Sequence, residues 1–386
     1  MVQNFRLIVI AGFALFSMFF GSGNLVFPLQ IGVQTLDQCS YALMGFITTG
    51  VLVPFIGFMS MVLNGGDRRK FFAYLGKKPA FVITIIILLI MGPLGVAPRC
   101  LIVGYGGVKL MDIGIPFWIF SALFSILIGA FIWNPNRIIA ILGMILTPWL
   151  LAGVFLLIIT GLWMGFEPAS SAMSSFNAGC EGFIRGYQTT DLPIAFFFSV
   201  ITIEYIHLYF KEKEATGSVT KTAIYAGLIG TSLLAIIYIG FATLGAKYAP
   251  ILGNTQPEEM LGIIAGSTLG IVAIPAAAIV IALACLTTAI SLMAIFAEFL
   301  TTDIFQGRVN HHWSILITVI STFFVSLIGF DNLAVFLGGI LEILYPALIV
   351  FAIAVILNKL FQFQYVKSPF WLTIGGMGGL KLLALI

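Results

Sequence analysis

The residues best suited to chemistry lie between Phe20 and Pro28, where the chain reads FGSGNLVFP. Glycine, asparagine and proline form helices poorly, yet this stretch interrupts an apolar run of helical length. We therefore predict an unwound break within the helix. Its free carbonyl groups could bind a cation and its free N–H groups an anion, as a small zwitterion requires. The alternative is that the two glycines only allow close helix packing.

A second discontinuity is predicted at Gly186–Pro193, which reads GYQTTDLP. Pro193 lacks an N–H donor and disfavours helix at Leu192. This stretch leads into Ile194–Ser199, which reads IAFFFS. Two broken helices that meet at one place would form a binding site for a small molecule.

Oxygen ligands for a cation are predicted in the segment Ala284–Ser291, which reads ACLTTAIS. Ala284, Thr287 and Thr288 fall at positions i, i+3 and i+4, so one carbonyl and two hydroxyls share one face of a helix. Small cations prefer such hard oxygen ligands. The alternative is that each hydroxyl only bonds to the carbonyl one turn earlier.

Ionisable residues inside apolar segments also mark candidate functional positions. Arg99 and Glu342 lie deep in such segments, and Asp191 lies near the second discontinuity. An unpaired arginine at membrane depth costs at least about 2.5 kcal/mol. We therefore expect Arg99 to pair with Glu342, or else with Asp191, either as a gate or as a fixed structural pair.

The elements that hold these residues are membrane-spanning helices. Of the 386 residues, 60% are apolar and only 9% are charged, whereas soluble proteins carry about 25% charged residues. A span needs about 20 apolar residues, which predicts an all-α membrane protein with about eleven spans. The Lys and Arg residues are scattered, which argues against nucleic acid as a partner. The predicted spans are 6–34, 40–63, 80–108, 114–133, 137–163, 184–208, 220–245, 267–300, 313–329, 332–357 and 369–386.

The order of the spans predicts an inverted repeat within a single transporter domain covering 1–386. The polar segment 166–185 separates five spans from five others, and an odd number in each half forces opposite orientations in the membrane. The repeats would be 6–163 and 184–357, with 369–386 as an additional helix. The Lys and Arg residues gather on the side of the amino terminus, which places that terminus in the cytoplasm. The four cysteines lack metal-ligand spacing, and pairing of Cys39 with Cys180 stays open.

Several motifs resemble those of the bacterial branched-chain amino acid:cation symporters. They are Phe13–Gly32, the GPLGVAPR of Gly92–Arg99, the GYQTTD that ends at Asp191, and the LACLTTAI of Leu283–Ile290. The resemblance implies a leucine-transporter-type fold of the amino acid/polyamine/organocation superfamily, with five plus five helices and broken first and sixth spans. It also implies uptake of leucine, isoleucine and valine with sodium. The chain departs from the family pattern at Thr190, where a Met is usual, and at Ser199, where a Gly is usual.

The resemblance also suggests a role for each candidate residue. The substrate carboxylate would meet the N–H groups of Ser22–Asn24, and the ammonium group would face carbonyls near Phe20 and in Ala195–Phe198. The predicted substrate-binding residues are Phe19, Phe20, Gly21, Ser22, Gly23, Asn24, Ala195, Phe196, Phe197, Phe198 and Ser199. The implied sodium ligands are Ser17, Phe20, Ala284, Thr287 and Thr288.

The sequence thus predicts a sodium-coupled symporter in the bacterial cytoplasmic (inner) membrane, with no cofactor other than the coupling ion. Proton coupling would need a titratable group near Thr288, and Glu298 is more than two helical turns away. A proton-coupled carrier of another apolar amino acid, such as methionine, is the main alternative. An integral-membrane enzyme is the less favoured one, because we find no nucleophile constellation in the sequence.

Overall fold

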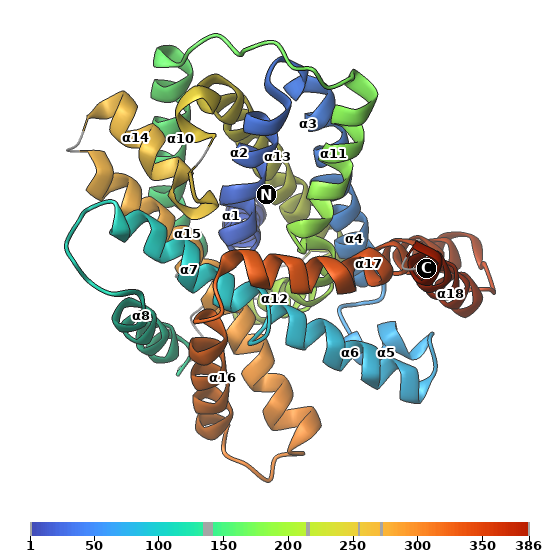
Figure 1. Ribbon diagram of the computed structural model, residues 1–386. Helices are drawn as coiled ribbons and strands as arrows, with labels where there is room; N and C mark the ends of the chain where they lie inside the picture. The colour runs from blue at the N-terminus through green and yellow to red at the C-terminus, as the bar shows by residue number, and fades with distance from the viewer. Residues whose placement is uncertain (1, 134–141, 214–216, 254, 271–272, 385–386) are drawn as a thin grey trace.

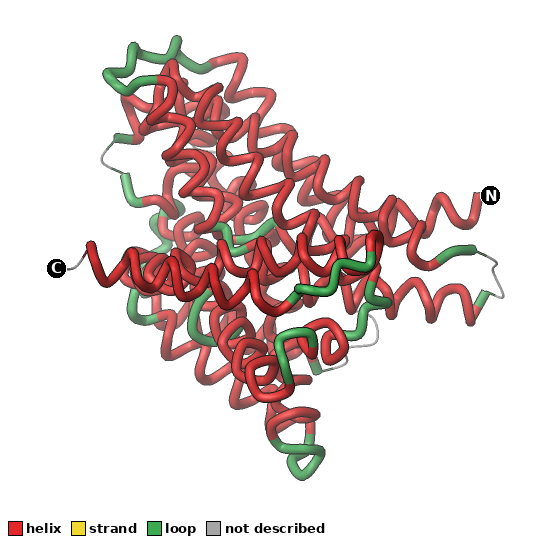
Figure 2. The backbone as a smooth tube through the Cα atoms, turned by 90° about the vertical axis from the view of Figure 1, so that its right-hand side faces the viewer, coloured by secondary structure: helices red, strands yellow, loops and turns green. Residues whose placement is uncertain are grey.

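The computed structural model describes residues 2–133, 142–213, 217–253, 255–270 and 273–384. All regular secondary structure in these ranges is helical, which confirms the all-α prediction. Helices satisfy every interior backbone group without water, as a chain that crosses lipid requires. Figure 2 shows a bundle of long helices, with the two termini at opposite sides of the molecule.

The helices follow one another along the chain with short connections. The first half contains α1 (Val2–Phe19), α2 (Ser22–Thr35), α3 (Cys39–Ile47), α4 (Val53–Leu63), α5 (Arg68–Ala73), α6 (Lys77–Met91), α7 (Val96–Lys109), α8 (Phe117–Ile132) and α10 (Thr147–Met164). The second half contains α11 (Ser175–Gln188), α12 (Asp191–Glu212), α13 (Val219–Leu252), α14 (Met260–Leu269), α15 (Ile274–Phe299), α16 (His311–Ser326), α17 (Phe330–Phe361) and α18 (Lys367–Ala384).

Within these ranges seven helical segments are long and apolar enough to cross a membrane, and three more apolar helices are shorter. The chain is therefore a multi-pass membrane protein, while the count of eleven spans stays a prediction. The start of the fifth predicted span, at residue 137, lies outside the described residues. Short π-helical segments join α3 to α4 and precede α10, so each pair continues as one longer helix.

The first span is broken where the glycine-rich motif predicts. Helix α1 ends at Phe19, and α2 begins at Ser22. Gly21 between them is extended, and its N–H donates to Asn24 Oδ1 at 3.3 Å. Pro28 lies inside α2 without ending it, so the glycines, and not the proline, set the break.

The sixth span is also broken, but its bounds differ from the prediction. Its first half, α11, begins at Ser175 and not near residue 184, and the chain turns at Thr190, whose φ is +65°. Pro193 lies in the first turn of α12, where a missing N–H costs nothing. The expected unwinding at residues 195–199 is therefore wrong, because α12 continues without interruption through them.

Close helix packing explains why α11 looks like a loop in the sequence. A Cβ atom at Gly182 would lie 1.9 Å from the carbonyl oxygen of Ala42 in α3, and one at Gly45 would lie 2.1 Å from that of Gly179. Small residues let the two backbones approach closely. They also lower the hydropathy of α11, so the segment resembles a polar connection.

A third break, which we did not predict, divides the span at residues 80–108. Helix α6 ends at Met91 and α7 begins at Val96. A Cβ atom at Gly95 would lie 2.2 Å from the carbonyl oxygen of Ile90, so this turn needs glycine. The break places Arg99 in the first turn of α7. Figure 1 shows α7 crossing near the centre of the molecule, close to α12 and α15.

Candidate functional site

The broken first and sixth spans meet. A Cβ atom at Gly23, in the first turn of α2, would lie 3.3 Å from Cα of Thr189, directly after α11. Next along α2, Asn24 Nδ2 donates to Asp191 Oδ2 at 2.8 Å. Two helix carboxyl ends and two helix amino ends therefore converge around these contacts. Such ends carry opposite partial charges, about half an elementary charge each.

The N–H groups predicted to bind a carboxylate are those of Ser22, Gly23 and Asn24. These residues form the first turn of α2, where backbone N–H groups have no partner within the helix. The hydroxyl of Ser22 also lies 3.6 Å from the thiol sulfur of Cys100 in α7, a contact the sequence did not suggest. The structure thus places these N–H groups at the junction of three broken spans.

A buried hydrogen-bond network links both breaks to α13. Tyr238 OH donates to Asp191 Oδ2 at 3.1 Å, and Asn24 Nδ2 contacts the same hydroxyl. All three side chains are at most 2% exposed. We did not predict Tyr238, although a tyrosine inside an apolar span needs a polar partner.

Arg99 stabilises the end of α11. Its Nη1 donates to the carbonyl oxygen of Gln188 at 3.1 Å, and its Nη2 donates to Thr190 Oγ1 at 3.0 Å. A cation at a helix carboxyl end interacts favourably with the unpaired carbonyls there. The guanidinium carbon also lies 5.7 Å from the ring centre of Phe27, close enough for a cation–π contact.

The prediction that Arg99 pairs with Glu342 is wrong. Glu342 Oε2 pairs with Lys381 Nζ at 2.7 Å, and the Glu342 side chain is 63% exposed. The alternative partner, Asp191, begins α12 directly after Thr190, but the hydrogen bonds of Arg99 go to Gln188 and Thr190. The break in the sixth span frees a nearby carbonyl, and this satisfies Arg99 without a carboxylate.

Four of the five predicted cation ligands converge between α1 and α15. Thr287 Oγ1 lies 2.9 Å from the carbonyl oxygen of Ser17 and 3.0 Å from that of Ala284. Thr288 Oγ1 lies 3.3 Å from the same Ser17 oxygen. All four residues are at most 1% exposed. The fifth predicted ligand, Phe20, precedes Gly21, where a Cβ atom would lie 2.7 Å from Thr288 Oγ1.

The phenylalanines of α12 do not line one common pocket. Phe198 packs edge-on against Phe19 at the end of α1, with ring centres 5.2 Å apart. Phe196 instead packs against Phe71 of α5, at 5.0 Å. The carbonyl of Phe196 accepts a hydrogen bond from Ser199 Oγ at 2.8 Å. Of this run, Phe198 therefore contacts the first break, whereas Phe196 faces away from it.

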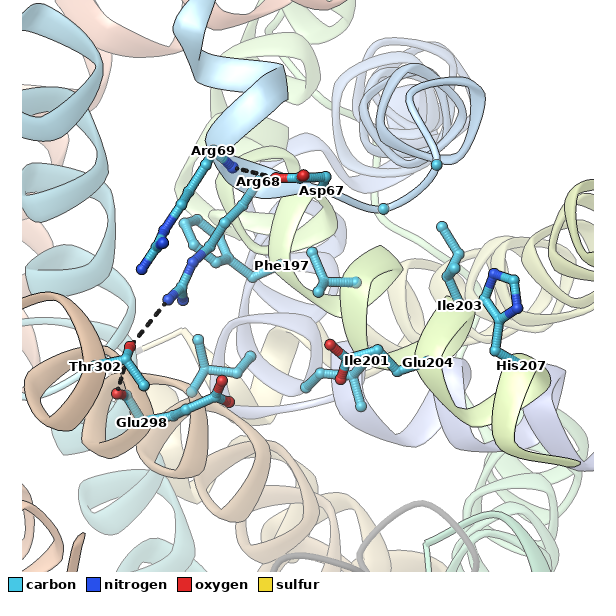
Figure 3. Close-up of a pocket in the computed structure, with 14 residues that line it drawn as sticks. Asp67, Arg68, Arg69, Phe197, Ile201, Ile203, Glu204, His207, Glu298 and Thr302 are labelled. Atoms are coloured by element: carbon cyan, nitrogen blue, oxygen red, sulfur yellow. Dashed lines mark hydrogen bonds between the residues drawn. The ribbon is translucent and has the colours of Figure 1, made fainter. Parts of the chain in front are cut away.

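A cavity of about 390 Å³ opens beside α12 and α15 (Figure 3). Phe197 and Ile201 line it from α12, and Glu298 lines it from α15. Arg68 and Arg69, which follow α4, both pair with Asp303; the contact of Arg69 measures 2.9 Å. We call this space the α12–α15 cavity.

The connection before α5 is held by Asp67, which also lines the α12–α15 cavity. Its carboxylate accepts hydrogen bonds from the backbone N–H groups of Arg69 and Lys70. The hydrogen bond from Lys70 N–H holds the pKa of Asp67 below its usual value. The side chain therefore stays ionised at neutral pH and caps α5.

Comparison with known proteins identifies the type of chain. A family model described as "Branched-chain amino acid transport protein" matches residues 4–381. The branched-chain amino acid permease BrnQ of Corynebacterium glutamicum is 30% identical over 89% of this chain and 79% of its own length. A protein of Staphylococcus aureus named as a branched-chain amino acid carrier is 28% identical over 91% of this chain and 82% of its own length.

Solved structures share the fold at low sequence identity. A nucleobase-cation-symport-1 family transporter, in a closed conformation with bromovinylhydantoin bound, has a TM-score of 0.61 at 15% identity and covers 96% of this chain and 91% of its own. A Na⁺-coupled sialic acid symporter in an outward-open state has a TM-score of 0.60 at 13% identity and covers 96% and 88%. Identity this low supports the transporter fold and carries no information on substrate.

Proposed function

This chain belongs to the branched-chain amino acid transport protein family, and we propose that it imports leucine, isoleucine and valine together with sodium. It is a membrane transporter and not an enzyme. The family supports the substrate class, whereas the coupling ion and the binding residues are our proposals. We further propose that it resides in the bacterial cytoplasmic membrane with its amino terminus inside, and that residues 6–163 and 184–357 form the two repeats.

The observation that carries the sodium proposal is the oxygen cluster between α1 and α15. It contains two carbonyls and two hydroxyls, all neutral, and these suit a monovalent ion better than calcium, which favours carboxylates. Gly21 packs directly against Thr288, so an ion here would lie beside the first break. An ion that joins α1 to α15 would favour the conformation that binds substrate, and this would couple the two gradients.

The substrate is proposed to lie between the two breaks. Its carboxylate would accept from the N–H groups at the start of α2, where the helix end is positive. Its side chain would pack near Phe19 and Phe198, whose rings are in contact. The α12–α15 cavity would then serve as the route of release, because Phe197 and Ile201 of the same helix line it.

Competition for labelled leucine uptake in proteoliposomes tests the substrate class. Leucine has three more carbons than alanine, and each buried methylene contributes about 0.8 kcal/mol. We therefore expect half-inhibition by leucine, isoleucine and valine at concentrations tens of times lower than by alanine. Equal inhibition by alanine, or methionine competing better than all three, would contradict the proposed substrate class.

A further inference from the structure

Asp191 has one carboxylate oxygen that nothing in the described part of the chain satisfies. Its Oδ2 accepts hydrogen bonds from Asn24 and Tyr238, whereas its Oδ1 has no hydrogen-bond partner. The side chain is fully buried. A buried carboxylate without a positive partner is costly at membrane depth and usually marks a functional position.

The nearest basic side chain does not satisfy this oxygen. Both terminal nitrogens of Arg99 bond elsewhere, to the carbonyl of Gln188 and to the hydroxyl of Thr190. The oxygen cluster at Thr287 and Thr288 already offers neutral ligands for a metal ion on the other side of Gly21. A separate positive group is therefore needed at Asp191.

The substrate carries such a group, and its predicted partners are not free. The sequence predicts that the ammonium group meets carbonyls of residues 195–198, but these lie inside the uninterrupted helix α12. The carbonyls of Phe196 and Phe198 additionally accept hydrogen bonds from Ser199 and Thr202, each at 2.8 Å. Asp191 lies nearer the first break, because it bonds directly to Asn24 in the first turn of α2.

We infer that Asp191 Oδ1 binds the α-ammonium group of the substrate. This rests on the proposed function, since it assigns a partner to one end of the proposed amino acid substrate. The carboxylate of the substrate stays at the N–H groups of α2, and Asn24 lies between the two ends, with its backbone N–H at one and its side chain at the other. Tyr238 and Asn24 act as positioning residues, because both bond to Oδ2 and leave Oδ1 free.

The test compares leucine with 4-methylpentanoate, which is leucine without its ammonium group. Dissociation constants for both are measured on purified wild-type protein and on Asp191→Asn, which keeps the shape of the side chain and removes its charge. Losing one buried charged partner weakens binding by about 100-fold. We expect the wild type to bind leucine at least about 100-fold more tightly than 4-methylpentanoate, and this ratio to fall about tenfold or more in Asp191→Asn.

Two further variants separate this role from a structural one. Tyr238→Phe removes a bond to the other carboxylate oxygen, so it should weaken both ligands alike and preserve the ratio. Asp191→Glu keeps the charge but displaces it, so it should lower the ratio even if Asp191→Asn fails to fold. An unchanged ratio in the Asp191 variants would overturn the inference, as would a change confined to the sodium requirement. A wild type that binds no branched-chain amino acid would instead reject the proposed function.

Discussion

Replacing Gly21 by valine is expected to reduce leucine uptake in proteoliposomes to background. Even the first added atom, Cβ, would lie 2.7 Å from Thr288 Oγ1 and 2.8 Å from Thr288 Cβ. Thr288 belongs to the buried helix α15, so α15 must shift away from the break to make room. The shift would disturb the substrate site and the cation site together. Insertion into a packed interior costs about 1–3 kcal/mol before any loss of function is counted.

The matched control is Gly338→Val in α17. Nothing lies within 4 Å of a Cβ atom placed at Gly338, so the same substitution meets open space. We expect this variant to retain uptake close to that of the wild type. If Gly21→Val transported leucine at the wild-type rate while remaining folded in detergent, the first break would not be the site.

Removing both hydroxyls of the cation site is expected to raise the sodium concentration needed for half-maximal uptake. The double variant Thr287→Ala with Thr288→Ala deletes two of the clustered oxygens and leaves the carbonyls of Ser17 and Ala284. Changes around a metal site typically cost about 10–100-fold in affinity, and we expect an increase in this range. Leucine binding should be retained at high sodium, because the substrate site lies beyond Gly21.

Thr243→Ala is the control for this double variant. Thr243 Oγ1 bonds to the carbonyl of Ile239 one turn earlier and faces away from the core, so its loss tests a threonine without the proposed role. Its sodium dependence should match the wild type. The same sodium dependence in the double variant would show that the two hydroxyls are not ligands.

Local sequence was sufficient to predict the first break, because Gly21 and Gly23 weaken the helix within a single turn. The common face of Ala284, Thr287 and Thr288 is equally local, since residues three and four apart are neighbours on a helix. Their meeting with Ser17 followed from the family resemblance, since no local pattern relates residues so far apart in the chain.

The second break was harder to predict, because tertiary packing determines it. Helix α11 is polar and rich in small residues, yet it packs closely against α3 through Gly182 and Gly45. The partner of Arg99 was missed for a related reason. Sequence suggests carboxylates as partners for arginine, whereas the structure provides the carbonyl of Gln188, which is free only because α11 ends there. Tyr238 gave only the weak signal of one hydroxyl within an apolar helix.

Accumulation of labelled leucine in proteoliposomes under imposed ion gradients tests sodium-driven import most directly. An inward sodium gradient is compared with an inward proton gradient and with choline replacing sodium, at the same internal volume and membrane potential. Our account predicts that leucine rises above its external concentration only under the sodium gradient, and that choline abolishes this accumulation. Accumulation under the proton gradient without sodium, or equilibration without accumulation under every gradient, would contradict it.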